Sequence, residues 1–101
     1  MTNAELISDF TRIRVVRGCT ILQIAIVTWP SPSEPRLGWR KFRSWSGQPQ
    51  PADIAAAQAE ALRDHRYFLR CERCRERCNV GHMHDDKVCQ GCAEQFLHVA
   101  Y

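Results

Sequence analysis

Hydrophobic and polar residues alternate over residues 10–16, and residues 20–29 are rich in β-branched side chains. Alternation with a period of two is typical of a strand that buries one face, and β-branched residues are favoured in strands. Between the two segments, Arg17 and Gly18 offer a two-residue turn. The pattern therefore predicts an antiparallel hairpin.

A third strand is predicted over residues 39–45, after a loop over residues 30–38. The loop is expected because its three prolines cannot donate hydrogen bonds to a neighbouring strand. In the resulting three-stranded sheet, Val16 lies opposite Cys19, and Trp29 lies opposite Trp39.

This pairing sorts the side chains onto two faces, because successive residues of a strand point to opposite sides. The face expected to be buried collects Thr11, Ile13, Val15, Thr20, Leu22, Ile24, Ile26 and Phe42. The other face is basic and aromatic, and its candidate partner-binding residues are Arg12, Arg14, Trp29, Trp39, Lys41, Arg43 and Trp45.

Residues 51–66 contain six alanines and begin with a proline, which suits the first turn of a helix. Thr2 and Glu5 form a capping-box pattern that predicts a shorter helix over residues 3–8. The expected fold class is α+β, with a three-stranded antiparallel sheet packed by one helix in a small domain over residues 1–69. A zinc-finger module over residues 70–101 follows it.

The chain has 101 residues and no run of 18 apolar residues, so no membrane span is expected. Its first residues, Met-Thr-Asn-Ala-Glu, lack the basic and apolar regions of a signal peptide, which predicts a cytoplasmic protein. Six cysteines in a reducing compartment favour metal binding over disulfides. Residues 1–50 carry seven basic and three acidic residues, a net charge of +4, whereas residues 51–101 carry seven and eight, a net charge of −1.

The strongest chemical signal is a pair of C-x₂-C motifs, Cys71–Cys74 and Cys89–Cys92, with 14 residues between them. Each motif places two sulfurs at one ion, and two motifs complete a closed tetrahedral site that suits one structural Zn²⁺. Alternative ligands in a Cys₃His arrangement are Cys78, His82 and His84, which lie between or beside the motifs.

The two motifs, the connecting segment over residues 80–88 and the following Ala-Glu-Gln-Phe-Leu together resemble a treble-clef zinc finger over residues 70–97. Within that class the segment is most similar to DksA/TraR-type fingers, and it also resembles the tails of small bacterial and phage zinc-finger proteins. The resemblance implies a zinc knuckle, a β-hairpin, and two last ligands at the start of a helix. It also implies a transcription-associated role, although the strands predicted for the first half differ from the coiled coil of that family.

Three classes of function were weighed. A protein-binding adaptor or inhibitor is favoured, because Trp and Arg dominate protein hot spots and the small size is typical of phage or mobile-element proteins that block a host machine such as a defence system. Nucleic-acid binding is the alternative, because cations beside flat rings suit single strands of DNA or RNA. An HNH-like nuclease is disfavoured, since His82-Met-His84-Asp85 lacks the required downstream pattern. We therefore expect a non-enzymatic module with a protein or nucleoprotein partner and no small-molecule substrate.

Overall fold

The computed structural model describes residues 2–96 and has an α+β fold, as predicted. Three strands form one antiparallel sheet, and two short strands form a second. In chain order the elements are α1 (Asn3–Phe10), β1 (Thr11–Val16), β2 (Cys19–Ser31), β3 (Glu34–Ser46), α2 (Pro51–Leu62), β4 (Phe68–Arg70), β5 (Arg77–Asn79), the 3₁₀ turn η1 (Val80–His82) and α3 (Gln90–Phe96).

The first hairpin has the predicted register, with Val16 opposite Cys19 and Thr11 opposite Ile24. Its two turn residues both adopt positive φ, 51° at Arg17 and 76° at Gly18. Two consecutive left-handed residues match the right-handed twist of the flanking strands, which is why the chain reverses within two residues here.

The second hairpin differs from the prediction: residues 30–38 are not a loop, and Trp29 does not lie opposite Trp39. β2 continues to Ser31, β3 begins at Glu34, and Trp39 pairs with Ala25. The prolines are tolerated because β1 ends opposite Ile24, so that β2 has an open edge beyond this point, and because β3 is itself an edge strand. A proline whose nitrogen faces such an edge removes no hydrogen bond from the sheet.

The division of the side chains into faces also needs one correction. The register shifts by one residue between Leu22 and Gln23, so that Gln23 pairs with Lys41 whereas Leu22 pairs with Arg43. A one-residue bulge moves every later side chain to the other face. Arg43 and Trp45 therefore lie on the face of Leu22 and not on the predicted basic face. On this side Arg43 forms an ion pair with Glu60 of α2, at 2.6 Å.

The predicted apolar face is covered by α2, as expected. Leu22 and Ile24 of the sheet belong to one buried cluster with Ala57, Ala61 and Leu62 of the helix. The helix ends at Leu62, four residues earlier than predicted, since the backbone N–H of Arg66 donates to the Asp64 side chain at 2.9 Å in a local turn. The following Tyr67 and Phe68 complete the cluster.

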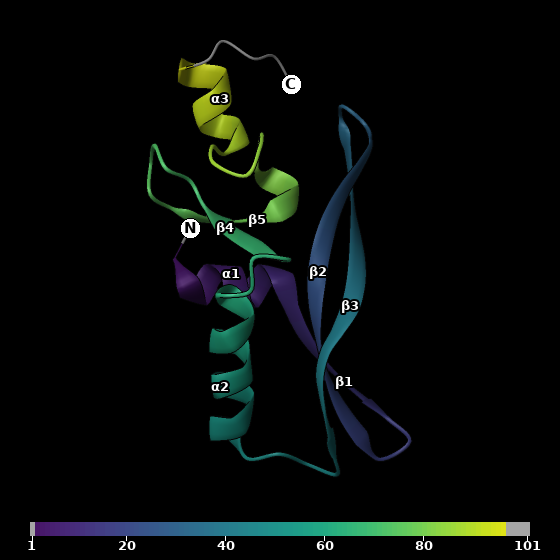
Figure 1. The fold of residues 1–101 in the computed structure, drawn as a ribbon. Helices are drawn as coiled ribbons and strands as arrows, with labels where there is room; N and C mark the ends of the chain where they lie inside the picture. The colour runs from purple at the N-terminus through teal and green to yellow at the C-terminus, as the bar shows by residue number, and fades with distance from the viewer. Residues whose placement is uncertain (1, 97–101) are drawn as a thin grey trace.

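The N-terminal helix α1 carries the predicted capping box: the backbone N–H of Glu5 donates to Thr2 Oγ1, and that of Thr2 to Glu5 Oε1. Its buried residues are Leu6 and Phe10, and the Phe10 ring meets the Phe68 ring edge-on at 6.2 Å. In Figure 1, α1 crosses between α2 and the β4–β5 hairpin, beside the long β2–β3 pair.

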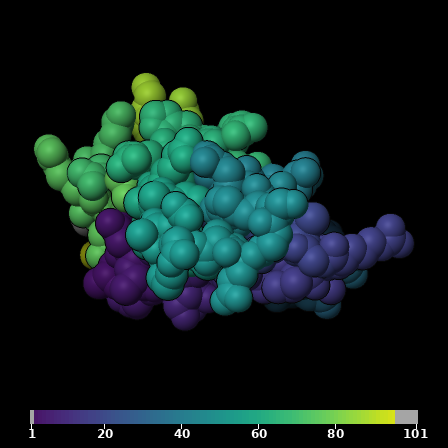
Figure 2. Space-filling view, turned by 90° about the horizontal axis from the view of Figure 1, so that it is seen from below, coloured from purple at the N-terminus to yellow at the C-terminus, as the bar shows by residue number. Residues whose placement is uncertain are grey.

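The molecule is elongated, with extents of 49 × 27 × 18 Å. The β1–β2 turn stands out from the body in Figure 2, and α3 lies at the other end in Figure 1. Across residues 2–96, no helix has the length and apolar character needed to cross a membrane.

Candidate metal centre

The first cysteine pair lies on a tight loop between β4 and β5. The backbone N–H of Cys71 donates to the Glu76 carbonyl and that of Arg75 donates to the Cys71 carbonyl, both at 2.9 Å. Arg75 adopts a left-handed conformation with a φ of 61°. The loop therefore closes back on itself, and this closure brings Cys71 and Cys74 to the same side.

The second cysteine pair lies at the start of α3. Cys89 directly precedes the helix and bridges to Met83, while Cys92 lies in its first turn. The intervening loop is held by Asp85, whose Oδ1 accepts the backbone N–H groups of Lys87 and Val88 at 2.8 Å each. A knuckle, a short bridged loop and a helix thus follow one another in the predicted order.

The four side chains converge on one point: the sulfurs of Cys71, Cys74, Cys89 and Cys92 all lie within 4.8 Å of one another. The Cys74 and Cys89 sulfurs are 3.9 Å apart. A tetrahedral ion with metal–sulfur bonds of about 2.3 Å separates its sulfurs by about 3.8 Å. The donor set and its spacing therefore fit a metal ion bound by four cysteines.

The thiols have different proton affinities because their surroundings differ. Burial opposes ionisation of Cys71, but the backbone N–H groups of Cys89, Cys74 and Arg73 stabilise its thiolate and lower its pKa to about 6. Burial, together with the neighbouring sulfurs, raises the pKa of Cys92 to about 12. Four thiolates at this spacing repel one another, so a cation at their centre is what allows all four to ionise.

The alternative ligands are not part of this group of four. The Cys78 sulfur lies 3.8 Å from the Glu76 carbonyl, and burial raises its pKa to about 11. The His82 ring packs between the rings of Phe10 and Trp29, at 5.6 and 6.2 Å between centroids. His84 is exposed on the loop before α3, where its backbone N–H donates to the Val88 carbonyl at 2.8 Å. Among the described residues, the group of four sulfurs does not include these three side chains.

The sequence gave no hint of the residue that joins this cluster to the large sheet. Asn79 is fully buried, and its Nδ2 donates to the Ala25 carbonyl at 2.8 Å while its Oδ1 accepts the Val27 N–H at 3.4 Å. Its amide thus bonds the edge of β2 where β1 has ended, as a neighbouring strand would. The only related signal in the sequence is the Asn-Val-Gly turn, which Asn79 closes by accepting the Gly81 N–H at 3.0 Å.

Gly81 makes the closest approach at this junction. A Cβ atom on Gly81 would lie 2.2 Å from the Val27 carbonyl oxygen and 2.5 Å from the Val27 Cβ. The indole N–H of Trp29 donates to the Gly81 carbonyl at 2.7 Å. The cysteine-bearing segment is therefore fastened to β2 through main-chain atoms. The division at residue 69 stays a prediction, and residues 97–101 of the predicted finger lie outside the described residues.

The structure gives the three tryptophans of the predicted binding face internal contacts. Trp29 bonds Gly81, Trp45 packs against the core, and the Arg12 guanidinium lies 4.3 Å from the Trp39 ring centroid. The predicted face is thus divided: Arg12, Arg14, Trp39 and Lys41 remain together on the side opposite α2.

Comparisons with protein-family models, with curated proteins and with solved structures found no match to this chain.

Proposed function

We propose that the protein is a non-enzymatic binding module that one structural zinc ion stabilises, and that its basic sheet binds a protein partner as an adaptor or inhibitor. The convergence of four cysteine sulfurs at 4.8 Å or less is the observation that carries the proposal. Thiolates favour Zn²⁺ over harder cations, and four protein ligands leave no open position at which the metal could activate a substrate. The free cysteines place the protein in a reducing compartment such as the cytoplasm.

Zinc content tests the first part. Protein purified under reducing conditions should contain one equivalent of zinc, and Cys71→Ser should lower both this content and the melting temperature. Cys19→Ser is the matched control, because Cys19 is exposed at the start of β2 and lies outside the group of four. A wild-type protein that stays folded without metal, or equal zinc content in both variants, would contradict the proposal.

The charge of the sheet supports the second part. Residues 11–46 carry seven basic residues and one acidic residue, a net charge of +6. Within the part of the chain that the structure describes, Arg14, Arg36, Arg40 and Lys41 have no carboxylate partner. Such a surface attracts an acidic protein face and speeds its association.

Two double variants locate the binding face. Arg14→Glu with Lys41→Glu reverses the charge on the side opposite α2, and Arg36→Glu with Arg40→Glu makes the same change on the other side of the sheet. We expect the first variant to lose a protein captured from a nuclease-treated lysate and the second to retain it. Equal retention by both variants would disprove the assignment.

Binding of nucleic acid is the second candidate, because the same excess of cations would attract phosphate groups. The internal contacts of the three tryptophans leave little aromatic surface on which bases could stack. Nuclease treatment separates the two functions: loss of the captured partner after digestion, with an affinity that falls steeply with salt, would favour nucleic acid.

A further inference from the structure

The outer edge of β1 is open and regular. β1 is an edge strand without a proline or a bulge, and among the described residues Ile13 and Val15 make no backbone hydrogen bond outside the β1–β2 pair. In a two-residue hairpin, bonded and non-bonded pairs alternate from the turn, so the N–H and C=O groups of these two residues point outward. The other edge, β3, is interrupted by Pro35 and by the bulge near Lys41. Only the β1 edge therefore offers an uninterrupted ladder.

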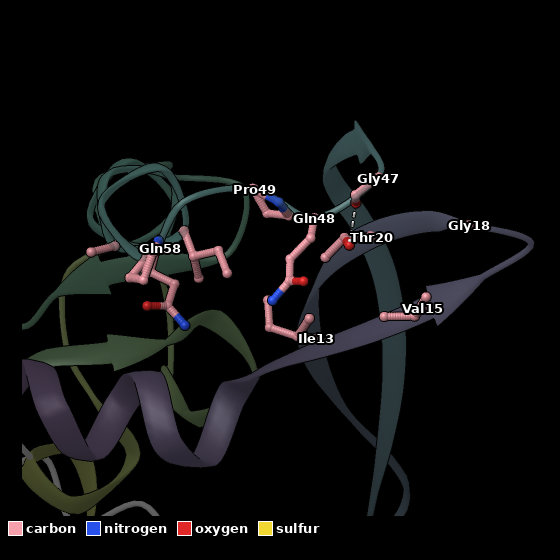
Figure 3. A pocket seen from close by; sticks show the side chains of 11 residues that line it. Ile13, Val15, Gly18, Thr20, Gly47, Gln48, Pro49 and Gln58 are labelled. Atoms are coloured by element: carbon pink, nitrogen blue, oxygen red, sulfur yellow. Dashed lines mark hydrogen bonds between the residues drawn. The ribbon is translucent and has the colours of Figure 1, made fainter.

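The same residues expose apolar side chains beside a groove. Ile13 is 39% exposed and Val15 is 69% exposed. Both line a groove of about 470 Å³ between the sheet and the first turns of α2, together with Thr20, Pro49, Ile54 and Ala55. Figure 3 shows Ile13 and Val15 on β1 at one side of this groove, with Pro49 across from them. An apolar surface of this kind on a strand edge is a docking site for an extended chain.

The charge of β1 decides what chain fits. Arg12 and Arg14 alternate with Ile13 and Val15, so they point to the other face. A second copy of β1 would place arginines opposite arginines, which destabilises a pair of strands. A chain with acidic residues at alternate positions would place them next to Arg12 and Arg14, and its apolar residues would cover Ile13 and Val15.

We infer that β1 binds an extended peptide of alternating acidic and apolar residues, which adds to the sheet as a fourth strand. The inference rests on the proposed function, since it identifies the protein partner by the chemistry of the segment that the sheet recognises. Main-chain hydrogen bonds to Ile13 and Val15 supply the docking, and the alternation of arginine and apolar residues on β1 supplies the specificity.

The test uses an eight-residue peptide of alternating glutamate and valine, blocked at both ends, added to the zinc-loaded protein. We expect it to bind with a Kd of roughly 1 mM or lower and to slow amide exchange at Ile13 and Val15. A lysine–valine peptide of the same length should bind at least about tenfold more weakly. Methylating alternate peptide nitrogens distinguishes the two peptide edges: blocking one set should abolish binding, and blocking the other should leave it unchanged.

Variants give an independent readout. Arg14→Glu should weaken the glutamate peptide about tenfold and strengthen the lysine peptide, and Val15→Ser should weaken both peptides without loss of fold, since Val15 is exposed. Arg36→Glu is the matched control, because Arg36 lies near the other end of the β2–β3 hairpin. Its effect should be less than about twofold.

Three results would overturn the inference: no binding of the glutamate peptide, protection along β3 instead of β1, or displacement of the peptide by a single-stranded oligonucleotide with a steep salt dependence. If the double variant of Arg14 and Lys41 loses its captured partner but the peptide leaves Ile13 and Val15 unprotected, the proposed function stands and the β1 site is wrong. If the peptide protects β1 but capture ignores the charge variants, the reverse holds.

Discussion

Gly81 lies against β2 at a distance that only a residue without a side chain allows. A Cβ atom there would lie 2.2 Å from the Val27 carbonyl oxygen, which belongs to the backbone and cannot rotate away. We expect Gly81→Ala to lower the free energy of unfolding by about 3 kcal/mol, because the segment must move off β2 and lose the bonds of Asn79 and Trp29. Urea denaturation of the zinc-saturated protein measures this change.

Gly91→Ala is the control for this substitution. Gly91 is also close to the cysteine cluster, but a Cβ atom there meets nothing within 4 Å. It lies in α3, where alanine is favoured over glycine, so the variant should be as stable as the wild type or up to about 1 kcal/mol more stable. Equal loss of stability in both variants would show that the contact with Val27 is not the cause.

The His82 ring adds a pH dependence to the same junction. Burial lowers its pKa from the usual 6.5, so that below this pH the unfolded chain takes up a proton that the folded protein resists. The folded state therefore loses stability as the pH falls through about 6.5. His82→Phe should remove this contribution, because phenylalanine keeps a ring beside Phe10 and Trp29 without a titrating group.

The measurement is the difference in unfolding free energy between wild type and His82→Phe at pH 7.5 and pH 5.5, at a fixed excess of zinc. Both proteins keep the four cysteines, so acid loss of the metal cancels in the comparison. The wild type should lose more stability than the variant on acidification. A difference that does not change with pH would contradict the buried position of the ring.

Spacing alone identified the four cysteines, because the geometry of a C-x₂-C pair is local and a metal ion needs two such pairs. Asn79 could not be identified in this way. Its three partners, Ala25, Val27 and Gly81, include two that are more than fifty residues distant in sequence, and all are main-chain atoms. A contact made to main-chain atoms leaves no pattern of side chains in the sequence.

At the scale of elements, the first hairpin turn invites improvement. Arg17 adopts a φ of 51°, a conformation that asparagine tolerates better than arginine, and Gly18 follows at 76°. Arg17→Asn should therefore raise the free energy of unfolding by about 0.5 kcal/mol, whereas Gly18→Ala should lower it by about 1 kcal/mol. Thermal denaturation of both variants checks the opposite signs, and a shift of the same sign in both would contradict this account of the turn.

The strands show which features of a sheet a sequence specifies. Short-range turn chemistry at Arg17 and Gly18 fixed the first register, and the prediction there was confirmed. The second register depends on a bulge near Lys41 and on prolines at open edges, and both depend on which strands lie alongside. Arg43 was misplaced for this reason, since one extra residue on β3 moves it to the side of Glu60.

For the whole molecule, the long dimension separates two chemistries. The cysteine cluster lies toward one end, and the β1–β2 turn lies toward the other (Figure 1). β2 runs between them, bonded by Asn79 near its far end and paired with β1 along its first half. Substitutions at the β1 edge can therefore be made without touching the residues that bind the metal.

The amide of Asn79 grips carbonyl and N–H groups that every residue but proline possesses. Positions 25 and 27 are thus free to drift in side-chain identity, provided they stay small enough for Gly81 to approach. A metal-bound segment of this design is portable: transplanted beside the unpaired margin of another sheet, it would find the same handholds there.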